Sequence, residues 1–180
     1  STFCETCDAG KFTTADQTHC QNCSAGFYGD RPGQASAGAC DPCSTGTFNS
    51  LAGQGSSTAC VACHKGQYNS ASGQAACREC SAGTYNDERG RSSENDCRAC
   101  LEGQFNDKKG QIACKDCPPG NYNAKEGMAR CIKCEAGRFF AGTGATSSTE
   151  CQICVGARYS GTGAETCIPC SKGKFIPPEL

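Results

Sequence analysis

The stretch that decides the fold is CKDCPPGNYNAKEGMARCIKC, residues 114–134. It holds two C-x-x-C pairs, separated by a glycine, a tyrosine and a polar turn. In an intracellular protein such spacing indicates four thiolates around zinc, whereas in a secreted protein it indicates disulfides. The rest of the chain has to decide between the two.

The same unit recurs along the whole chain. Ten C-x-x-C pairs use all 20 cysteines, and successive pairs begin 16, 17 or 20 residues apart. Glycine stands three residues after the pair in nine of the ten copies; the exception has Ala157 there. Such self-similarity indicates a linear array rather than a globule. We predict a small disulfide-rich fold: a linear, solenoid-like rod of stacked irregular hairpins with little regular secondary structure.

An aromatic residue follows every pair at the fifth position. We expect these residues to pack on neighbouring disulfides and to give each repeat a minimal core. They are Phe12, Tyr28, Phe48, Tyr68, Tyr85, Phe105, Tyr122, Phe139, Tyr159 and Phe175. Asparagine follows the aromatic in five copies and favours an Asx turn, and a second glycine further on can adopt positive φ. The segment from the first glycine to the aromatic should be extended.

Composition shows why covalent links are needed. Of 180 residues, only 18 are Leu, Ile, Val or Phe, and there is no Trp, so an ordinary core cannot form. The net charge of −1 gives no basic excess for nucleic acid, and no apolar run approaches the ~18 residues of a membrane span. Cysteine at this density indicates an oxidising, extracellular environment. We therefore expect the chain to be secreted or to lie on a cell surface or an appendage.

Zinc and redox catalysis are the alternatives to structural disulfides. Zinc sites would group the pairs two by two, so alternate gaps should differ, yet every gap carries the same glycine–aromatic–glycine pattern. A catalytic C-x-x-C needs a thioredoxin-like βαβ setting, which is missing here. We therefore expect no metal, no cofactor and no enzymatic activity.

Two disulfide schemes are compatible with the spacing. Successive pairs can interlock first to first and second to second, or the second cysteine of each pair can bond the first of the next. The uniform repeat favours the latter, which leaves Cys4 and Cys170 over. It gives Cys7–Cys20, Cys23–Cys40, Cys43–Cys60, Cys63–Cys77, Cys80–Cys97, Cys100–Cys114, Cys117–Cys131, Cys134–Cys151 and Cys154–Cys167. Residues 1–180 would then form one continuous array of loops 7–20, 23–40, 43–60, 63–77, 80–97, 100–114, 117–131, 134–151 and 154–167, a fragment of a longer array at both ends.

The motif C-x-x-G-x-[FY], followed by G-x-x-x-C-x-x-C, resembles the ephrin-receptor-like cysteine-rich repeat. It is also similar to the short first module of tumour-necrosis-factor-receptor cysteine-rich domains. In that module the outer cysteines bond each other, and the resemblance implies Cys117–Cys131 and its equivalents. Those receptors alternate two module types, whereas this array is monotonous. Long uniform arrays of this kind resemble surface and appendage proteins of algae and protists, including mastigoneme (flagellar hair) proteins.

The leading functional hypothesis is a non-enzymatic extracellular spacer or fibre element of a larger surface or appendage protein. If each hairpin contacts only its nearest neighbours, the array can be lengthened without redesign. Layers about 10 Å apart would give a rod on the order of 100 Å. We expect protein partners, through self-association, adhesion or other surface and filament chains, with no nucleic acid and no membrane insertion. Glycans are possible, with Asn22 in NCS as a glycosylation candidate.

The alternative is a ligand-binding receptor ectodomain of the cysteine-rich-repeat type. Its best candidate sites are two charged turn tips, NDERGR at 86–91 and NDKKG at 106–110. The simpler interpretation of both tips is a solvated turn.

Overall fold

The computed structural model describes residues 4–174 as a succession of small two-stranded antiparallel hairpins. The prediction of a small disulfide-rich fold of stacked hairpins with little regular secondary structure is confirmed. The strands are β1 (Lys11–Thr13), β2 (Cys20–Asn22), β3 (Phe27–Tyr28), β4 (Asp41–Pro42), β5 (Thr47–Phe48), β6 (Val61–Ala62), β7 (Gln67–Tyr68), β8 (Arg78–Glu79), β9 (Thr84–Tyr85), β10 (Arg98–Ala99), β11 (Gln104–Phe105), β12 (Lys115–Asp116), β13 (Asn121–Tyr122), β14 (Ile132–Lys133), β15 (Arg138–Phe139), β16 (Gln152–Ile153), β17 (Arg158–Tyr159) and β18 (Ile168–Pro169).

Each hairpin pairs the strand that carries the aromatic with the strand between the next two cysteines. In residues 114–134, for example, Tyr122 of β13 lies opposite Ile132 of β14. The hairpin is closed by the Cys134 amide, which donates to the carbonyl of Gly120 at 2.8 Å. The first glycine has positive φ, for example +77° at Gly120, so the extended segment begins one residue later than the sequence suggested.

The longer repeats take up their extra residues in one turn of 3-10 helix. These turns are η1 (Ala37–Ala39), η2 (Ser57–Ala59), η3 (Glu94–Asp96) and η4 (Ser148–Glu150), each ending directly before the closing cysteine. A serine precedes each turn, and Ser93 and Ser147 form complete capping boxes with Asp96 and Glu150. Both boxes correspond to a sequence signal, S-x-x-[DE] directly before a cysteine.

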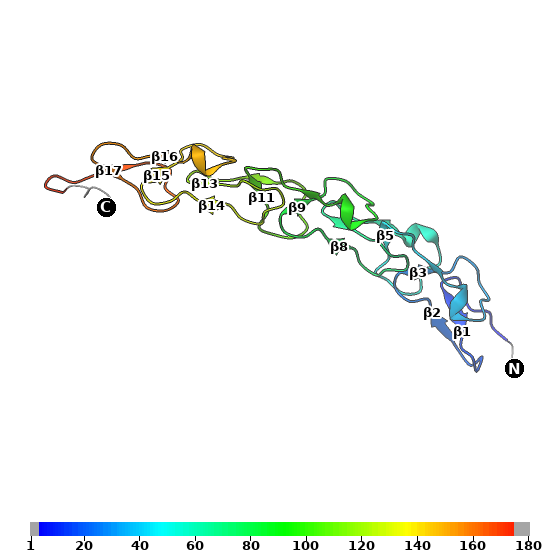
Figure 1. Cartoon of the computed structure of the whole chain (residues 1–180). Helices are drawn as coiled ribbons and strands as arrows, with labels where there is room; N and C mark the ends of the chain where they lie inside the picture. The colour runs from blue at the N-terminus through cyan, green and yellow to red at the C-terminus, as the bar shows by residue number, and fades with distance from the viewer. Residues whose placement is uncertain (1–3, 175–180) are drawn as a thin grey trace. The chain divides into compact units, whose positions relative to one another are not determined.

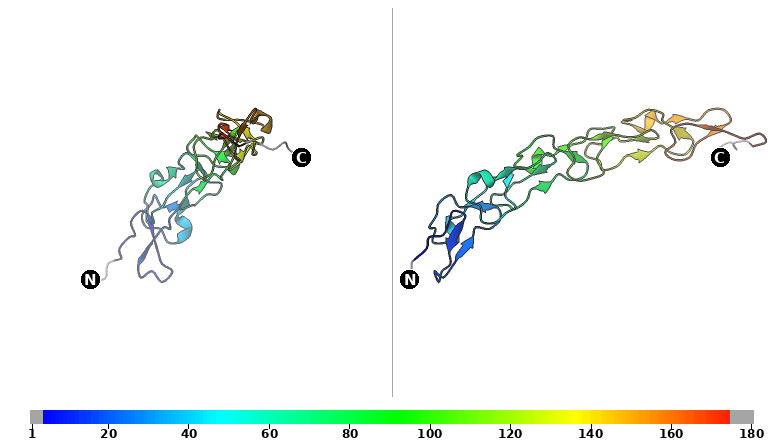
Figure 2. Two further views of the ribbon diagram at one scale, coloured as in Figure 1. Left: turned by 90° about the vertical axis from the view of Figure 1, so that its left-hand side faces the viewer. Right: turned by 180° about the vertical axis from the view of Figure 1, so that it is seen from behind.

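The chain forms two compact units, which are described separately. Among the described residues, unit 1 comprises 4–80 and 86–97, and unit 2 comprises 81–85 and 98–174. Within each unit the hairpins follow one another in chain order instead of gathering around one centre (Figures 1 and 2). We number them by their disulfide loops: hairpins 1 to 9 span 7–20, 23–40, 43–60, 63–77, 80–97, 100–114, 117–131, 134–151 and 154–167.

Successive hairpins are held together mainly by backbone hydrogen bonds, and we call each such contact a joint. At the joint between hairpins 6 and 7, the Gly103 amide donates to the Asn123 carbonyl at 2.8 Å. The Gly127 amide donates back to the Cys100 carbonyl, also at 2.8 Å. The same two bonds recur at the joint between hairpins 7 and 8, from Gly120 to Phe140 and from Gly144 to Cys117. Because the partners are backbone groups, these bonds can form whichever side chains the two hairpins carry.

Hairpins also touch their second neighbours, which corrects the expectation of nearest-neighbour contacts only. The first glycine of one hairpin lies against the second glycine two hairpins further on. A Cβ built on Gly120 would fall closer than 3.0 Å to the carbonyl of Gly163. The equivalent pairs are Gly10 with Gly53, Gly26 with Gly73, Gly46 with Gly90, Gly83 with Gly127 and Gly103 with Gly144. These close approaches explain why glycine recurs three residues after the cysteine pair.

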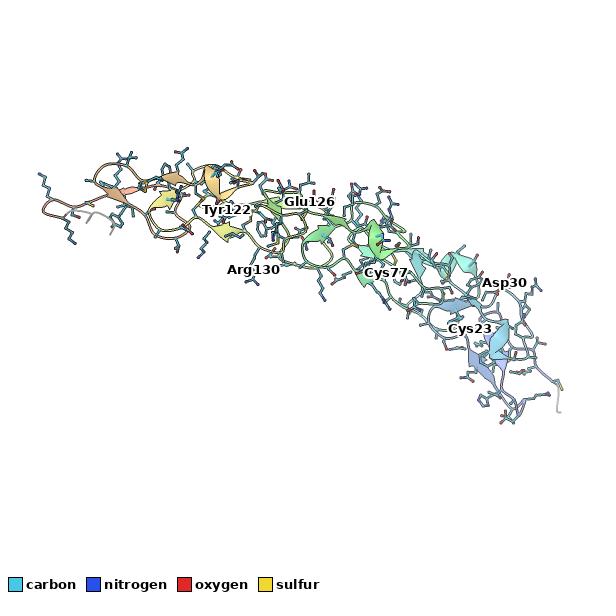
Figure 3. The ribbon with its side chains drawn as sticks, viewed as in Figure 1. Cys23, Asp30, Cys77, Tyr122, Glu126 and Arg130 are labelled. Carbon is cyan, nitrogen blue, oxygen red and sulfur yellow. A yellow bond between two sulfur atoms is a disulfide. The ribbon has the colours of Figure 1, made fainter. Side chains whose placement is uncertain are left out.

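The interior of each hairpin is very small. The most deeply buried side chains are the second cysteines of the pairs and the asparagines that follow the aromatics. Apolar residues such as Leu51, Ile153 and Val155 are more than half exposed. Figure 3 shows the consequence: many of the drawn side chains point away from the ribbon.

Candidate functional site

The disulfides define the site that repeats along the array. In the structure they join Cys7–Cys20, Cys23–Cys40, Cys43–Cys60, Cys63–Cys77, Cys80–Cys97, Cys100–Cys114, Cys117–Cys131, Cys134–Cys151 and Cys154–Cys167. The Cα–Cα distances are 5.5–5.8 Å in long and short loops alike. Closing loops of this length is worth about 3 kcal/mol each in the chain-entropy model. Peptide mapping under non-reducing conditions tests the pairing directly, and recovery of Cys20 with Cys40 would support the interlocked scheme.

The aromatics contribute less to the interior than predicted. Phe12 and Tyr68 are buried, at 9% and 7% exposure, whereas Tyr159 is half exposed. Tyr28, Phe48, Tyr85, Phe105, Tyr122 and Phe139 are intermediate. Phe175 lies outside the described residues. The residue opposite each aromatic is exposed on its strand, and in one hairpin Arg98 lies 5.9 Å from the centroid of the Tyr85 ring. The aromatic is therefore a half-covered packing element rather than the centre of a core.

The asparagine after the aromatic links one hairpin to the one before it. Its Nδ2 donates to the carbonyl of the strand residue just before the previous aromatic, and we call this bond the asparagine lock. The bonds run from Asn49 to Phe27, Asn69 to Thr47, Asn86 to Gln67, Asn106 to Thr84 and Asn123 to Gln104, at 2.6–3.1 Å. In hairpin 9 the Ser160 hydroxyl makes the equivalent bond to Arg138 at 2.7 Å. The Asx turn expected from the sequence is present at Asn49 and Asn86, but the link between hairpins was not predicted.

Removing one asparagine lock should weaken its joint measurably. Asn86→Ala removes the donor to Gln67 and the acceptor of the Glu88 amide, and it leaves a half-buried carbonyl without its partner. We expect a loss of about 1–3 kcal/mol in the local opening free energy, measured by hydrogen exchange at the Gly66 and Gly90 amides. Asn95→Ala is the matched control, because the exposed Asn95 side chain is not needed for its turn. Equal effects of the two substitutions would argue against the lock.

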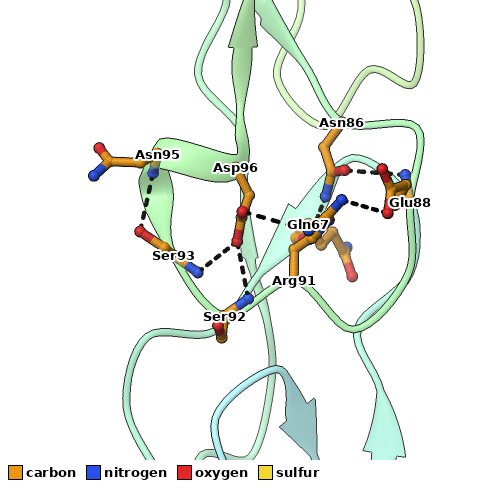
Figure 4. A network of polar contacts seen from close by, with 8 residues as sticks. All are labelled: Gln67, Asn86, Glu88, Arg91, Ser92, Ser93, Asn95 and Asp96. Atoms are coloured by element: carbon orange, nitrogen blue, oxygen red, sulfur yellow. Dashed lines mark hydrogen bonds and ion pairs between the residues drawn. The ribbon is translucent and has the colours of Figure 1, made fainter.

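The first charged tip, at 86–91, is tied to its own hairpin and to hairpin 4. Arg91 forms an ion pair with Glu88 and lies 3.7 Å from Asp96, whose other oxygen accepts from the Ser92 and Ser93 amides (Figure 4). Arg89 donates to His64 Nδ1 at 3.2 Å. These contacts support the interpretation of this tip as a structural turn.

The second tip, at 106–110, has one internal ion pair. The Lys115 ammonium donates to Asp107 at 3.2 Å and holds the pKa of that carboxyl below its ordinary value. Both groups are about half exposed, so the pair contributes little to stability.

Asp16 organises the turn of hairpin 1, where the other repeats have glycine. The positive φ of this turn falls on the next residue, Gln17. Thr14 donates its hydroxyl to Asp16 Oδ1 at 2.5 Å, and Thr18 donates its hydroxyl and its amide. These hydrogen bonds lower the pKa of Asp16 from 3.8 to about 2.

The Asp16 carboxylate should therefore stay ionised in unusually acidic solution. Because its folded pKa is lowered, the bonds stabilise the turn above pH about 3.8 and are lost as the pH falls through about 2. An NMR titration of the Asp16 side chain should give a midpoint near 2. Thr14→Ala together with Thr18→Ala should bring the midpoint back toward 3.8. A wild-type midpoint already near 3.8 would contradict these bonds.

The remaining sequence candidates lie on the surface. Asn22 is exposed on β2, with its amide group against Gly53. Cys4 is exposed and Cys170 is half-buried, and neither is in a disulfide. Within residues 4–174, no group of three or more His, Cys, Asp or Glu side chains is placed to hold a metal ion. None of the helical turns in this range could cross a membrane.

Comparison with known proteins identifies the repeat. Residues 52–97, 91–127 and 103–151 match one family model, described as tyrosine-protein kinase ephrin type A/B receptor-like. The overlapping matches together span 52–151, more than half of the chain, and each contains closed disulfide loops. A search of curated proteins finds no match.

Proposed function

Since the chain belongs to the ephrin type A/B receptor-like family of extracellular, disulfide-rich repeats, we propose that it is a non-enzymatic spacer or fibre element of a larger surface or appendage protein. The observation that carries this proposal is the composition of the joints. They consist of backbone hydrogen bonds, glycine contacts and asparagine locks that recur from hairpin to hairpin. A contact that is repeated in this way can be extended by adding repeats, as a spacer requires.

Two further features support a spacing role over ligand capture. The charges of the 86–91 tip form contacts within unit 1, and Asp107 of the other tip pairs with Lys115. Apolar side chains are scattered over the surface at more than half exposure, as at Leu51, Leu101 and Val155. Partners would then be other copies or other surface chains along the outside of the array.

Electron microscopy of the oxidised chain tests the proposal. We expect extended particles on the order of 100 Å, from hairpins about 10 Å apart. Reduction should convert them to flexible coils, because the glycine-rich loops gain chain entropy and the small interiors cannot hold them. Compact particles would overturn the spacer. Saturable binding of a defined protein that is lost with Arg89→Ala or with Lys108→Ala and Lys109→Ala would instead support the receptor ectodomain.

A further inference from the structure

The joints of the array are not all equal. Six of the joints described above carry a side-chain lock, from asparagine or, at Ser160, from serine. The lock position holds Gly29 in hairpin 2 and Phe140 in hairpin 8. Neither residue has a side-chain group that can donate a hydrogen bond. The joint between hairpins 1 and 2 and the joint between hairpins 7 and 8 therefore lack this bond.

Both joints nevertheless keep their backbone hydrogen bonds. At the 7/8 joint, the Gly120 amide donates to Phe140 at 2.7 Å and the Gly144 amide donates to Cys117 at 2.8 Å. At the 1/2 joint, the Gly10 amide donates to Gly29 and the Gly33 amide to Cys7, both at 2.8 Å. The ring of Phe140 lies against Gly142 of its own turn. At the 1/2 joint the Thr13 hydroxyl also donates to the Gln34 carbonyl, at 3.4 Å, so a side chain of hairpin 1 replaces the missing lock there. Among the described residues, the 7/8 joint is held by its backbone hydrogen bonds alone.

Surface hollows accompany both joints. Each has a surface hollow, of about 340 Å³ at the 1/2 joint and about 260 Å³ at the 7/8 joint. The two hollows occupy the same place in the repeat. Both are lined by the aromatic of the preceding hairpin, the first residue of the 3-10 turn and the closing cysteine: Phe12, Ala37 and Cys40 in one, Tyr122, Ser148 and Cys151 in the other. A hollow leaves its lining atoms without packing partners on one side.

We propose that the 7/8 joint is a yielding point built into the array, at which successive hairpins separate more readily than at the neighbouring joints of unit 2. The missing lock and the hollow act in the same direction, because both reduce the contacts broken when a joint opens. This inference concerns the local stability of joints, so it holds whether the array serves as a spacer or as a ligand-binding ectodomain.

Hydrogen exchange on the full oxidised chain tests the proposal, because the 7/8 joint lies between two locked joints of the same unit. The reporters are the amides that cross each joint: Gly120 and Gly144 for 7/8, Gly103 and Gly127 for 6/7, and Gly137 and Gly163 for 8/9. After correction for intrinsic rates, Gly120 and Gly144 should exchange about 2- to 10-fold faster than the other four, as expected for one missing hydrogen bond. Equal protection at the three joints would overturn the proposal.

Two substitutions test the lock in opposite directions: one adds the missing side-chain donor and the other removes an existing one. Phe140→Asn places a donor where the 7/8 joint lacks one, and it should slow exchange at Gly120 and Gly144 to the rates of the flanking joints. Asn123→Phe should speed exchange at Gly103 and Gly127 by a similar factor, since it removes the bond to Gln104. If Phe140→Asn does not fold, the wild-type rates and Asn123→Phe still decide the question. No change at Gly120 in folded Phe140→Asn would show that the lock does not set joint strength.

Discussion

Replacing both Cys117 and Cys131 with alanine should open the middle of unit 2 while hairpins 1 to 4 stay protected from hydrogen exchange. The bridge closes hairpin 7, and its loss should cost about 3 kcal/mol. Cys117 is fully buried, so the cost includes packing lost at the most enclosed position of the hairpin. Few apolar contacts remain to compensate.

The extent of this opening distinguishes two pictures of the array. Hairpin 7 bonds to hairpins 6 and 8 through the Gly127 and Gly120 amides, and Gly120 also touches Gly163 in hairpin 9. Gly127 of hairpin 7 likewise lies against Gly83 in hairpin 5. Loss of protection should therefore spread to the second neighbour on each side. Cys4→Ala, which breaks no bridge, is the control. Opening confined to hairpin 7 would contradict the second-neighbour coupling, and simultaneous loss of protection over the whole chain would contradict the repeat organisation.

Gly120→Ala should be among the most damaging single substitutions that leave every disulfide intact. The new Cβ would overlap the backbone of Gly163, which cannot move aside as a flexible side chain could. Gly120 also has φ of +77°, where alanine is strained. The overlap and the strain together predict a loss of about 2–5 kcal/mol in stability of the 7–9 region.

Gly137→Ala separates the two contributions. Gly137 has nearly the same φ, +80°, but among the described residues nothing lies within 4 Å of its Cβ position. It should lose only about 1–2 kcal/mol from backbone strain. Thermal unfolding by circular dichroism, with hydrogen exchange at Gly163, measures both variants. Equal losses would mean that the close approach of Gly120 and Gly163 adds nothing to stability.

The sequence predicted the fold because the cysteine spacing and the low apolar content leave few alternatives. Every gap between pairs is alike, so every loop should close alike, and the family match agrees with this repeat. The prediction was less accurate for what fills the hairpins. A residue such as Tyr122 was assigned to the core because aromatics usually carry the buried area, but a layer this thin has no interior large enough to enclose the ring.

The contacts between hairpins could not be predicted from one repeat considered alone. Asn123 was assigned a local turn because asparagine bonds its own backbone well, yet its amide donates to Gln104 in the previous hairpin. Gly120 is expected from the sequence to begin an extended segment, but it adopts positive φ, and its lack of a side chain admits the backbone of a hairpin two repeats away. Both contacts depend on how successive hairpins stack. The conformational preferences of single residues do not contain that information.

The 3-10 turns have a consequence for how such chains diversify and can be engineered. Three extra residues are absorbed directly before the closing cysteine, as in η2 (Ser57–Ala59). The cysteine Cα atoms are 5.5 Å apart in that loop and 5.8 Å apart in the shorter loop 63–77. Insertions at this position therefore leave the distance between the bridged cysteines almost unchanged. Foreign peptides grafted between the second glycine and the closing cysteine should be displayed at intervals fixed by the scaffold. The array could therefore present epitopes at a defined spacing.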